Sequence, residues 1–317
     1  MADARVHHRR RQALYNSCGS MTSRLSILIP VYNQDCRRQV DALHRQAEAI
    51  RGLDYEIVVA DDGSTQPQYT ALCRDIARLS HVRFIERAEN VGRAAIRNLL
   101  AREAQYDWLL FIDGDMDIFP HFIANYLNAT IASVAYGGYT VGRGSATSLR
   151  YAYEKQCEPH HRAEERRKHP YQHFHTCNVY VRRDVMLQHP FDERFRRYGY
   201  EDVLWGKTLR QAGIEIAHPD NPVGFCTFEP NASFVAKTEE GLRTLHDFRD
   251  ELREYSQIVA LADRLRSGIV SRGLRIWHRL FGPMERRNLC GRHPSLAIFK
   301  LYKIGYFLSL TKNNKSL

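Results

Sequence analysis

Short β-rich runs alternate with helical stretches from residue 25 to residue 113, and this order limits the possible folds more than any other feature. The runs are LSILIPV, YEIVVA, VRFIE and WLLFID, and the helical stretches cover 36–51, 67–79 and 91–104. The runs are largely apolar, which is typical of strands that are buried on both faces. This order predicts an α/β fold with a mostly parallel central sheet flanked by helices.

Polar segments follow the ends of all four runs: PVYNQD, DDGSTQP, RAENVG and DGDMDIFP. Ligands of parallel sheets bind at the carboxyl ends of the strands, so these segments predict a binding site at one rim. The last segment places Asp113 and Asp115 on either side of Gly114, although neighbouring carboxylates repel each other. Such oxygen ligands suit Mg²⁺ or Mn²⁺, which would remove the repulsion, whereas an ordinary turn is the competing interpretation. Asp117 is expected to be solvated.

The second half of the chain is less regular. We expect a strand over 131–142, a charged helix or loop over 147–168, a strand over 174–183, a helix over 200–213 closed by Gly213, and one or two amphipathic helices over 236–267. The histidines between the charged segment and the next strand match no standard zinc spacing, which favours a mobile polar loop. They are His160, His161, His169, His173 and His175.

The formal net charge of +10 is concentrated at the two ends of the chain. From Arg264 to Leu317 there are twelve Lys or Arg and one acid, Glu285, and the first twenty residues hold four Arg and Asp3. A basic end differs from a uniformly basic surface, and no nucleic-acid-binding motif is present, so no nucleic-acid partner is expected. Aromatic and apolar residues are interleaved with the basic ones after residue 264. That pattern suits an amphipathic element on an anionic membrane surface or a C-terminal helix docked on the domain.

Seven cysteines are present without a CxxC pair, which favours reduced thiols in the cytoplasm. There is neither a signal peptide nor an apolar run long enough to span a bilayer. These features predict a cytoplasmic protein, with a peripheral position on the inner face of the plasma membrane as the alternative. Residues 1–22 are expected to form a flexible leader.

Five segments in order, LSILIPVYN, YEIVVADDGST, ENVGRAAIRN, WLLFIDGDMD and FDERFRRYGYEDVLWGKTLRQAG, resemble the motifs of family 2 glycosyltransferases, inverting enzymes with the GT-A fold. The resemblance spans about Leu25 to Lys237. It implies a Rossmann-like nucleotide-diphospho-sugar transferase domain over 23–235, with a nucleotide-binding half (23–118) and an acceptor half (119–235). A helical, basic C-terminal extension would then cover 236–317.

The resemblance also implies the residues that bind the donor and a divalent metal, Mn²⁺ or Mg²⁺. Arg93 and its neighbour Arg97 are placed to reach phosphate, although a solvated basic helix face is the alternative. The implied roles are Pro30, Val31 and Tyr32 beside the nucleoside, Asp62 reading the base, Asn90 touching the nucleotide, Asp113 near ribose and metal with Gly114 beside it, and Asp115 as direct metal ligand.

Inverting transfer needs a carboxylate that takes the proton of the acceptor hydroxyl. By resemblance Asp202 is this base and Glu201 its catalytic neighbour, at a helix start whose dipole favours the ionised form. The competing interpretation is that both are ordinary first-turn acids. One departure from the family concerns the DNPVxH pattern, in which many relatives place a histidine that completes the metal shell. This chain has Phe225 there, so Asp115, diphosphate and water would bind the metal, and His218 is a weaker candidate.

The resemblance implies an inverting glycosyltransferase that moves a hexose or N-acetylhexosamine from a nucleoside diphosphate sugar, with uridine as base. The acceptor would be a saccharide or lipid-linked saccharide, in polysaccharide or lipopolysaccharide synthesis. Two alternatives stay open: a non-catalytic nucleotide-sugar-binding subunit of a polysaccharide synthase, and a sugar-phosphate nucleotidyltransferase. The second would need a Gly-rich loop where the chain has IPVYNQDC, and a nicotinamide enzyme would need GxGxxG there.

Overall fold

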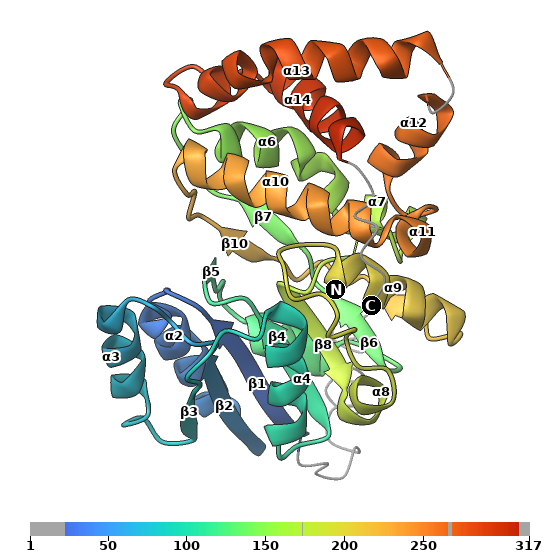
Figure 1. Ribbon diagram of the computed structural model, residues 1–317. Coiled ribbons are helices and arrows are strands. Elements are labelled where there is room, and N and C mark those ends of the chain that lie inside the picture. The colour runs from blue at the N-terminus through green and yellow to red at the C-terminus, as the bar shows by residue number, and fades with distance from the viewer. Residues whose placement is uncertain (1–22, 173, 266–267, 311–317) are drawn as a thin grey trace, which may run out of the picture.

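The computed structural model describes residues 23–172, 174–265 and 268–310, so the expected leader over 1–22 lies outside the described residues. A seven-stranded sheet forms one end of the molecule, in the order β3-β2-β1-β4-β8-β6-β9 (Figure 1). Its strands are β1 (Ser23–Val31), β2 (Leu53–Asp61), β3 (Val82–Glu86), β4 (Trp108–Ile112), β6 (Val134–Tyr136), β8 (Asn178–Arg182) and β9 (Ile216–Ala217).

The first four strands are parallel, as the alternating order predicts, because β1 pairs with both β2 and β4, and β2 pairs with β3. Strand β8 runs antiparallel to β4 and to β6, and β6 and β9 are parallel to each other. Residues 27–29 of β1 and 57–60 of β2 are fully buried, since helices cover both faces of the sheet. The predicted mostly parallel α/β sheet is therefore confirmed.

Helices connect the parallel strands: α2 (Arg37–Glu48), α3 (Pro67–Ile76) and α4 (Arg93–Glu103), and α5 (Phe122–Asn128) follows β4. Each helix turns one side inward. In α2 the buried apolar residues are Val40, Leu43 and Ala47, which recur every three or four residues. The helices therefore hold the strands so that all their carboxyl ends meet at one rim.

A second, three-stranded sheet, β5-β10-β7, lies beyond this rim. Its strands are β5 (Met116–Asp117), β7 (Tyr139–Val141) and β10 (Val223–Phe225). The prediction of one strand over 131–142 is therefore wrong: β6 and β7 belong to different sheets. Gly138, at φ +84°, allows the chain to turn between them, a conformation that favours glycine.

After β7 the chain continues with short helices. They are α6 (Leu149–Cys157), the 3₁₀ helix η1 (Glu158–His161), α7 (Ala163–Lys168), α8 (Arg183–Gln188) and α9 (Glu201–Gln211). The charged segment over 147–168 is thus largely helical, one of its two expected forms. His160 and His161 lie in η1 rather than in a loop, His169 and His175 lie outside the helices, and His173 lies outside the described residues. Gly213, at φ +70°, follows α9 and ends it as predicted.

The last part of the chain is helical, as expected. Its helices are α10 (Asn231–Asp247), α11 (Arg249–Leu252), α12 (Gln257–Leu265), α13 (Ile269–Cys290) and α14 (Leu296–Ser309). Helices α6, α10, α13 and α14 enclose a second apolar core that includes Phe234 and Phe299, and they lie on the side of the molecule opposite the large sheet (Figure 1). The expected boundary between residues 235 and 236 falls inside α10. Within the described ranges, no helix combines the length and the apolar character that crossing a membrane would require.

Candidate functional site

The rim at the carboxyl ends of the parallel strands borders a cavity of about 380 Å³. The strand ends and the loop before α4 bring together every residue that the sequence analysis placed on the donor side. These residues are Pro30, Val31, Tyr32, Asp62, Asn90, Arg93, Asp113, Gly114 and Asp115. The side chains that were expected to bind one ligand therefore line the same cavity.

The two acids after β2 have different partners. Asp61 accepts hydrogen bonds from the backbone and hydroxyl of Ser64, and so forms the turn after the strand. Asp62 is buried, and its two carboxylate oxygens accept the N–H groups of Val91 (2.9 Å) and Gly92 (3.0 Å). Burial raises the pKa of Asp62, although these two hydrogen bonds act to lower it. Asp62 thus fixes the loop before α4 against the rim, and each of its oxygens has a second lone pair that faces no backbone donor.

The acids after β4 lie at the centre of the rim. A Cβ on Gly114 would lie 2.8 Å from Cγ1 of Val31, so the backbone approach here requires glycine. Burial and the negative charge of Asp113 raise the pKa of Asp115, which Arg93 only partly offsets. Asp117 is exposed, as predicted.

Arg97 is buried between two carboxylates, and only 1% of it is exposed. Its guanidinium donates to Asp113 Oδ1 at 2.6 Å and to Glu201 Oε1 at 3.2 Å. The alternative that Arg97 lies on a solvated helix face is therefore wrong, whereas its contact with phosphate stays a prediction, because Arg97 also borders the rim cavity. A fork of several N–H donors can join two acids from distant parts of the chain, and here it joins β4 to α9.

Cationic side chains also line the rim cavity. The guanidinium of Arg93 lies 4.6 Å from the centre of the Tyr198 ring, and the ammonium of Lys237 lies 6.0 Å from the same centre. Arg150 pairs with Glu154 at 3.0 Å and also borders this cavity. These positive groups border the same cavity as Asp113 and Asp115, which suits a ligand with several negative charges bound through a cation.

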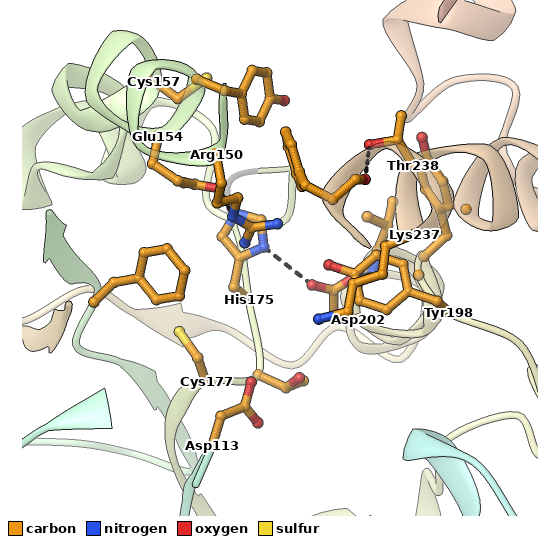
Figure 2. Close-up of a pocket in the computed structure, with 18 of the residues that line it drawn as sticks. Asp113, Arg150, Glu154, Cys157, His175, Cys177, Tyr198, Asp202, Lys237 and Thr238 are labelled. Atoms are coloured by element: carbon orange, nitrogen blue, oxygen red, sulfur yellow. Dashed lines mark hydrogen bonds and ion pairs between the residues drawn. The ribbon is translucent and has the colours of Figure 1, made fainter. Parts of the chain in front are cut away.

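A second cavity, of about 410 Å³, adjoins the first, and Arg93, Asp113, Arg150, Tyr198 and Lys237 line both. Figure 2 shows His175 and Asp202 on the wall of this second cavity, with Asp113 below them. Helices α6, α10 and α14 complete the wall, through residues such as Tyr153, Thr238 and Phe299. The C-terminal extension is therefore part of this site.

The two acids at the start of α9 lie in different surroundings. Glu201 is only 5% exposed and pairs with Arg97, and burial together with the charge of Asp202 raises its pKa. The side chain of Asp202 is 19% exposed, borders the second cavity, and lies 3.1 Å from Nδ1 of His175. Burial acts to raise the pKa of Asp202, but the hydrogen bond and charge of His175 hold it below the usual value. Both acids border the second cavity, and Asp202 is the one whose low pKa keeps it ionised.

His175 was not predicted as a site residue from the sequence. Burial acts to lower its pKa, but Asp202 raises it, so the pair is electrostatically matched. His175 comes three residues before β8, whose start lies beside the end of β4 because the two strands are antiparallel. The order of strands in the sheet was the missing information, since the spacing of the histidines carries no sign of it.

The residues present suit a divalent cation at the rim. Two partly buried carboxylates repel each other, as the raised pKa of Asp115 shows, and a cation would relieve that repulsion. Phe225 pairs with Met116 beside them and offers no ligand atom. His218 is buried against Arg166 and the carbonyl of Pro170, outside the lining of both cavities. Within residues 23–172, 174–265 and 268–310, no group of three or more His, Cys, Asp or Glu side chains is arranged to hold a metal, so further ligands would have to come from a bound ligand or water.

Comparison with known proteins identifies relatives of the first half of the chain. The model of the family described as "Glycosyl transferase family 2" matches residues 26–188. An uncharacterized glycosyltransferase of Haemophilus influenzae is 32% identical over 101 residues, which cover 32% of this chain and 38% of the relative. Chondroitin synthase of Escherichia coli is 30% identical over 106 residues, 32% of this chain and 15% of the relative. The chain thus spans well under half the length of these curated relatives.

Among solved structures, the mannosyltransferase PcManGT of Pyrobaculum calidifontis, in complex with GDP-Man and Mn²⁺, is similar over 96% of this chain and 91% of its own. The TM-score is 0.54 and the sequence identity is 14%. At this identity the similarity concerns the fold, which is the GT-A fold that the sequence predicted.

Proposed function

Since the chain belongs to glycosyltransferase family 2, whose model covers just over half of it, we propose that it transfers a sugar from a nucleoside diphosphate sugar to a saccharide hydroxyl, with inversion. One observation carries this proposal. The acids at the end of β4 and the ionised Asp202 border adjoining cavities that share Asp113, Arg93 and Lys237. A donor at the rim would therefore present its sugar to a base that an acceptor can also reach.

On the donor side, we assign the nucleoside to Pro30, Val31 and Tyr32 and the base to Asp62. The second lone pairs of the Asp62 oxygens can accept N–H groups of a base edge. Asn90 borders the same space. Among nucleotide sugars we propose UDP-hexose or UDP-N-acetylhexosamine.

The diphosphate would lie between the acids and the cationic wall. Arg93 and Lys237 lie there, where they can stabilise the negative charge of the leaving group. We propose that Asp115 and Asp113 hold Mn²⁺ or Mg²⁺, and when bound such an ion neutralises charge on the leaving diphosphate. Arg97 fixes the Asp113 carboxylate at 2.6 Å, and Glu201 acts through Arg97 as a positioning residue.

Asp202 is assigned as the general base that takes the proton of the acceptor hydroxyl. Its pKa is held low, so the carboxylate is ionised at neutral pH and can accept that proton. His175 donates to Oδ2 and the N–H of Val203 donates to Oδ1 at 2.8 Å, and the two bonds orient the carboxylate.

We further propose that the acceptor is a saccharide or lipid-linked saccharide in polysaccharide or lipopolysaccharide synthesis. The chain would act in the cytoplasm, peripheral on the inner face of the plasma membrane, through its basic C-terminal region. The E. coli relative is named as a chondroitin synthase, which supports a polysaccharide product. A cytoplasmic site would supply the nucleotide sugar.

The decisive experiment separates binding from turnover. Asp202→Asn removes the base and keeps the shape, so transfer should fall by about 10²–10⁴-fold while the thermal shift caused by UDP-sugar with Mn²⁺ stays. Asp184→Asn, an exposed first-turn acid of α8, is the matched control and should keep full transfer. If the donor binds wild type and the Asp202→Asn variant equally and neither protein transfers the sugar, the result would favour a non-catalytic subunit that binds nucleotide sugars. Pyrophosphate release from a nucleoside triphosphate and a sugar phosphate would favour the nucleotidyltransferase.

A thermal-shift screen of nucleoside diphosphates and their sugars, with and without Mn²⁺, would identify the base. A shift with one diphosphate supports the donor assignment. If no nucleotide shifts the melting temperature, the donor assignment is contradicted.

A further inference from the structure

Helix α13 turns its apolar side chains outward. Its inward side holds Ser271, His278 and Glu285 alongside Leu274 and Leu289, and it packs on α14, where Gly305 lets the chain approach His278 closely. Its outward side carries large apolar residues, of which Leu280 is 64% and Met284 67% exposed. A surface helix of a soluble protein normally shows the reverse pattern. An apolar face of this size marks a surface that binds something.

The exposed apolar residues form one continuous face. They are Ile269, Val270, Ile276, Trp277, Leu280, Phe281 and Met284. Each member lies three, four or seven positions from at least one other member, so the seven recur on one side of a helix with 3.6 residues per turn. We call these seven residues the outer face of α13.

Arginines flank this face along one edge. Arg272, Arg275 and Arg279 are exposed, again three, four or seven positions apart, and none of them forms an ion pair with another described residue. The acid of α13, Glu285, is turned inward, where it accepts the indole N–H of Trp277 at 2.8 Å. The outer face is therefore apolar and its edge purely cationic, which is the composition of a helix that lies in the surface of a membrane with anionic lipids.

The position of α13 fits this role. It runs along the edge of the molecule farthest from the large sheet, outside α10 and α14 (Figure 1). Helix α14, on which α13 packs, also contributes Phe299 and Lys303 to the wall of the second cavity. A membrane in contact with α13 would therefore lie on the acceptor side of the site, away from the end that binds the nucleotide.

We propose that the outer face of α13 inserts in the plane of an anionic lipid bilayer, with Arg272, Arg275 and Arg279 against the headgroups. This inference rests on the proposed peripheral location and assigns it to one helix. A second copy of the chain is the less suitable occupant, because an antiparallel pair of such faces would bring the two arginine edges together. A bilayer with negative headgroups complements both the apolar and the cationic part.

The apolar part is tested with vesicles of phosphatidylcholine mixed with phosphatidylglycerol, in a flotation assay on the full chain. Leu280→Gln keeps a good helix former and should lower the partition into vesicles about tenfold, because a leucine that inserts is replaced by a polar group. Leu187→Gln is the matched control: it lies on α8, is 43% exposed, and should partition like wild type. Vesicles should also shift the tryptophan emission to the blue, and Trp277→Phe should abolish that shift. Trp277 is exposed on α13, whereas Trp205 is buried and Trp108 stacks on Tyr180 in the large sheet.

The charge part compares two triple substitutions of exposed arginines to glutamine. One changes Arg272, Arg275 and Arg279, and the other changes Arg38, Arg45 and Arg51, on and just after α2. Each arginine near an anionic surface contributes about fivefold in partition, so the α13 triple should lose about 100-fold. The α2 triple removes the same charge and should lose little. Phosphatidylcholine alone should bind every variant weakly.

Three results would overturn the inference, and each has a separate meaning. If wild type does not bind anionic vesicles, both the peripheral location and the role of α13 are excluded. If the α13 variants bind anionic vesicles as well as wild type does, the peripheral location stands and the role of α13 is excluded. A dimer of wild type in light scattering that Leu280→Gln dissociates, without vesicle binding, would assign the face to a second copy. The thermal shift with UDP-sugar tests the donor site, so its outcome is independent of all three.

Discussion

Replacing Arg97 by methionine removes a guanidinium that lies 2.6 Å from Asp113 and 3.2 Å from Glu201. Glu201 is 5% exposed, so its charge would lose its ion-pair partner without regaining water. Removing one partner of a buried ion pair costs about 3–5 kcal/mol of unfolding free energy. In a domain of this size that is a fall of about 5–10 °C in Tm.

The loss should depend on pH with a definite sign. Burial already raises the pKa of Glu201, and Arg97 acts to lower it. In the variant the folded-state pKa rises further above the unfolded value, so the folded protein holds a proton that the unfolded chain releases. Stability from such a group is present below the unfolded pKa and is lost as pH rises through the folded pKa. The difference between Arg97→Met and wild type should therefore grow from pH 5 to pH 8.

Urea and thermal denaturation at several pH values measure this difference. Arg102→Gln, on the same helix, breaks a pair of 3.8 Å between side chains that are 56% and 51% exposed, and should cost less than about 1 kcal/mol. The double variant Arg97→Met with Glu201→Gln removes the buried charge and should recover part of the loss. An Arg97→Met protein that unfolds within about 1 kcal/mol of wild type at pH 8 would refute the reasoning.

Three further predictions concern the site. His175→Asn should move the acidic limb of the pH–rate profile to higher pH, since Asp202 must be ionised to accept a proton and its pKa is held down by His175; an unmoved limb would contradict this. Asp115→Asn should abolish the Mn²⁺-dependent part of the thermal shift with UDP, whereas Asp117→Asn, exposed and outside both cavities, should keep it. Gly63→Ala, at φ +70° with its Cβ 2.6 Å from a neighbouring loop backbone, should lower unfolding free energy by about 1–3 kcal/mol and weaken UDP binding, both measurable by calorimetry.

The donor half could be predicted because the rules that apply there are local. Apolar runs alternate with helices, parallel strands point the same way, and whatever follows their carboxyl ends must meet at one rim. Asp62, Asp113 and Asp115 are placed together by that rule alone. Their chemical roles in transfer remain proposals.

What could not be predicted depends on contacts between distant segments. Arg97 lies on α4 in a pattern typical of a solvated helix face, and its burial comes from Glu201, which is more than a hundred positions away in the chain. His175 belonged to a histidine-rich segment whose spacing matches no site. The positions of Arg97 and His175 in the site follow from the tertiary fold, in which β8 lies beside β4.

The C-terminal region shows the same limit. Its basic and apolar residues were compatible with a docked helix or with a membrane-surface element. The structure assigns the docked role to α14, whose Phe299, Tyr302 and Phe307 are buried, and leaves the exposed apolar residues on α13. Both helices combine basic and apolar residues, with more arginine in α13, and only the packing against each helix shows which apolar side chains are covered.

Because β8 runs against β4, the chain re-enters the large sheet where β4 leaves it, and the N–H of Asp113 donates to the carbonyl of Cys177 across this junction at 3.3 Å. The insert over 142–177 is thus held at its C-terminal end by this hydrogen bond. Its helices make few contacts with strands β1–β4. The insert nevertheless reaches both cavities, because Arg150 borders the two of them and His175 borders the second. Grafting this insert between relatives would therefore exchange part of the wall of both cavities while the strand ends at the rim stay in place.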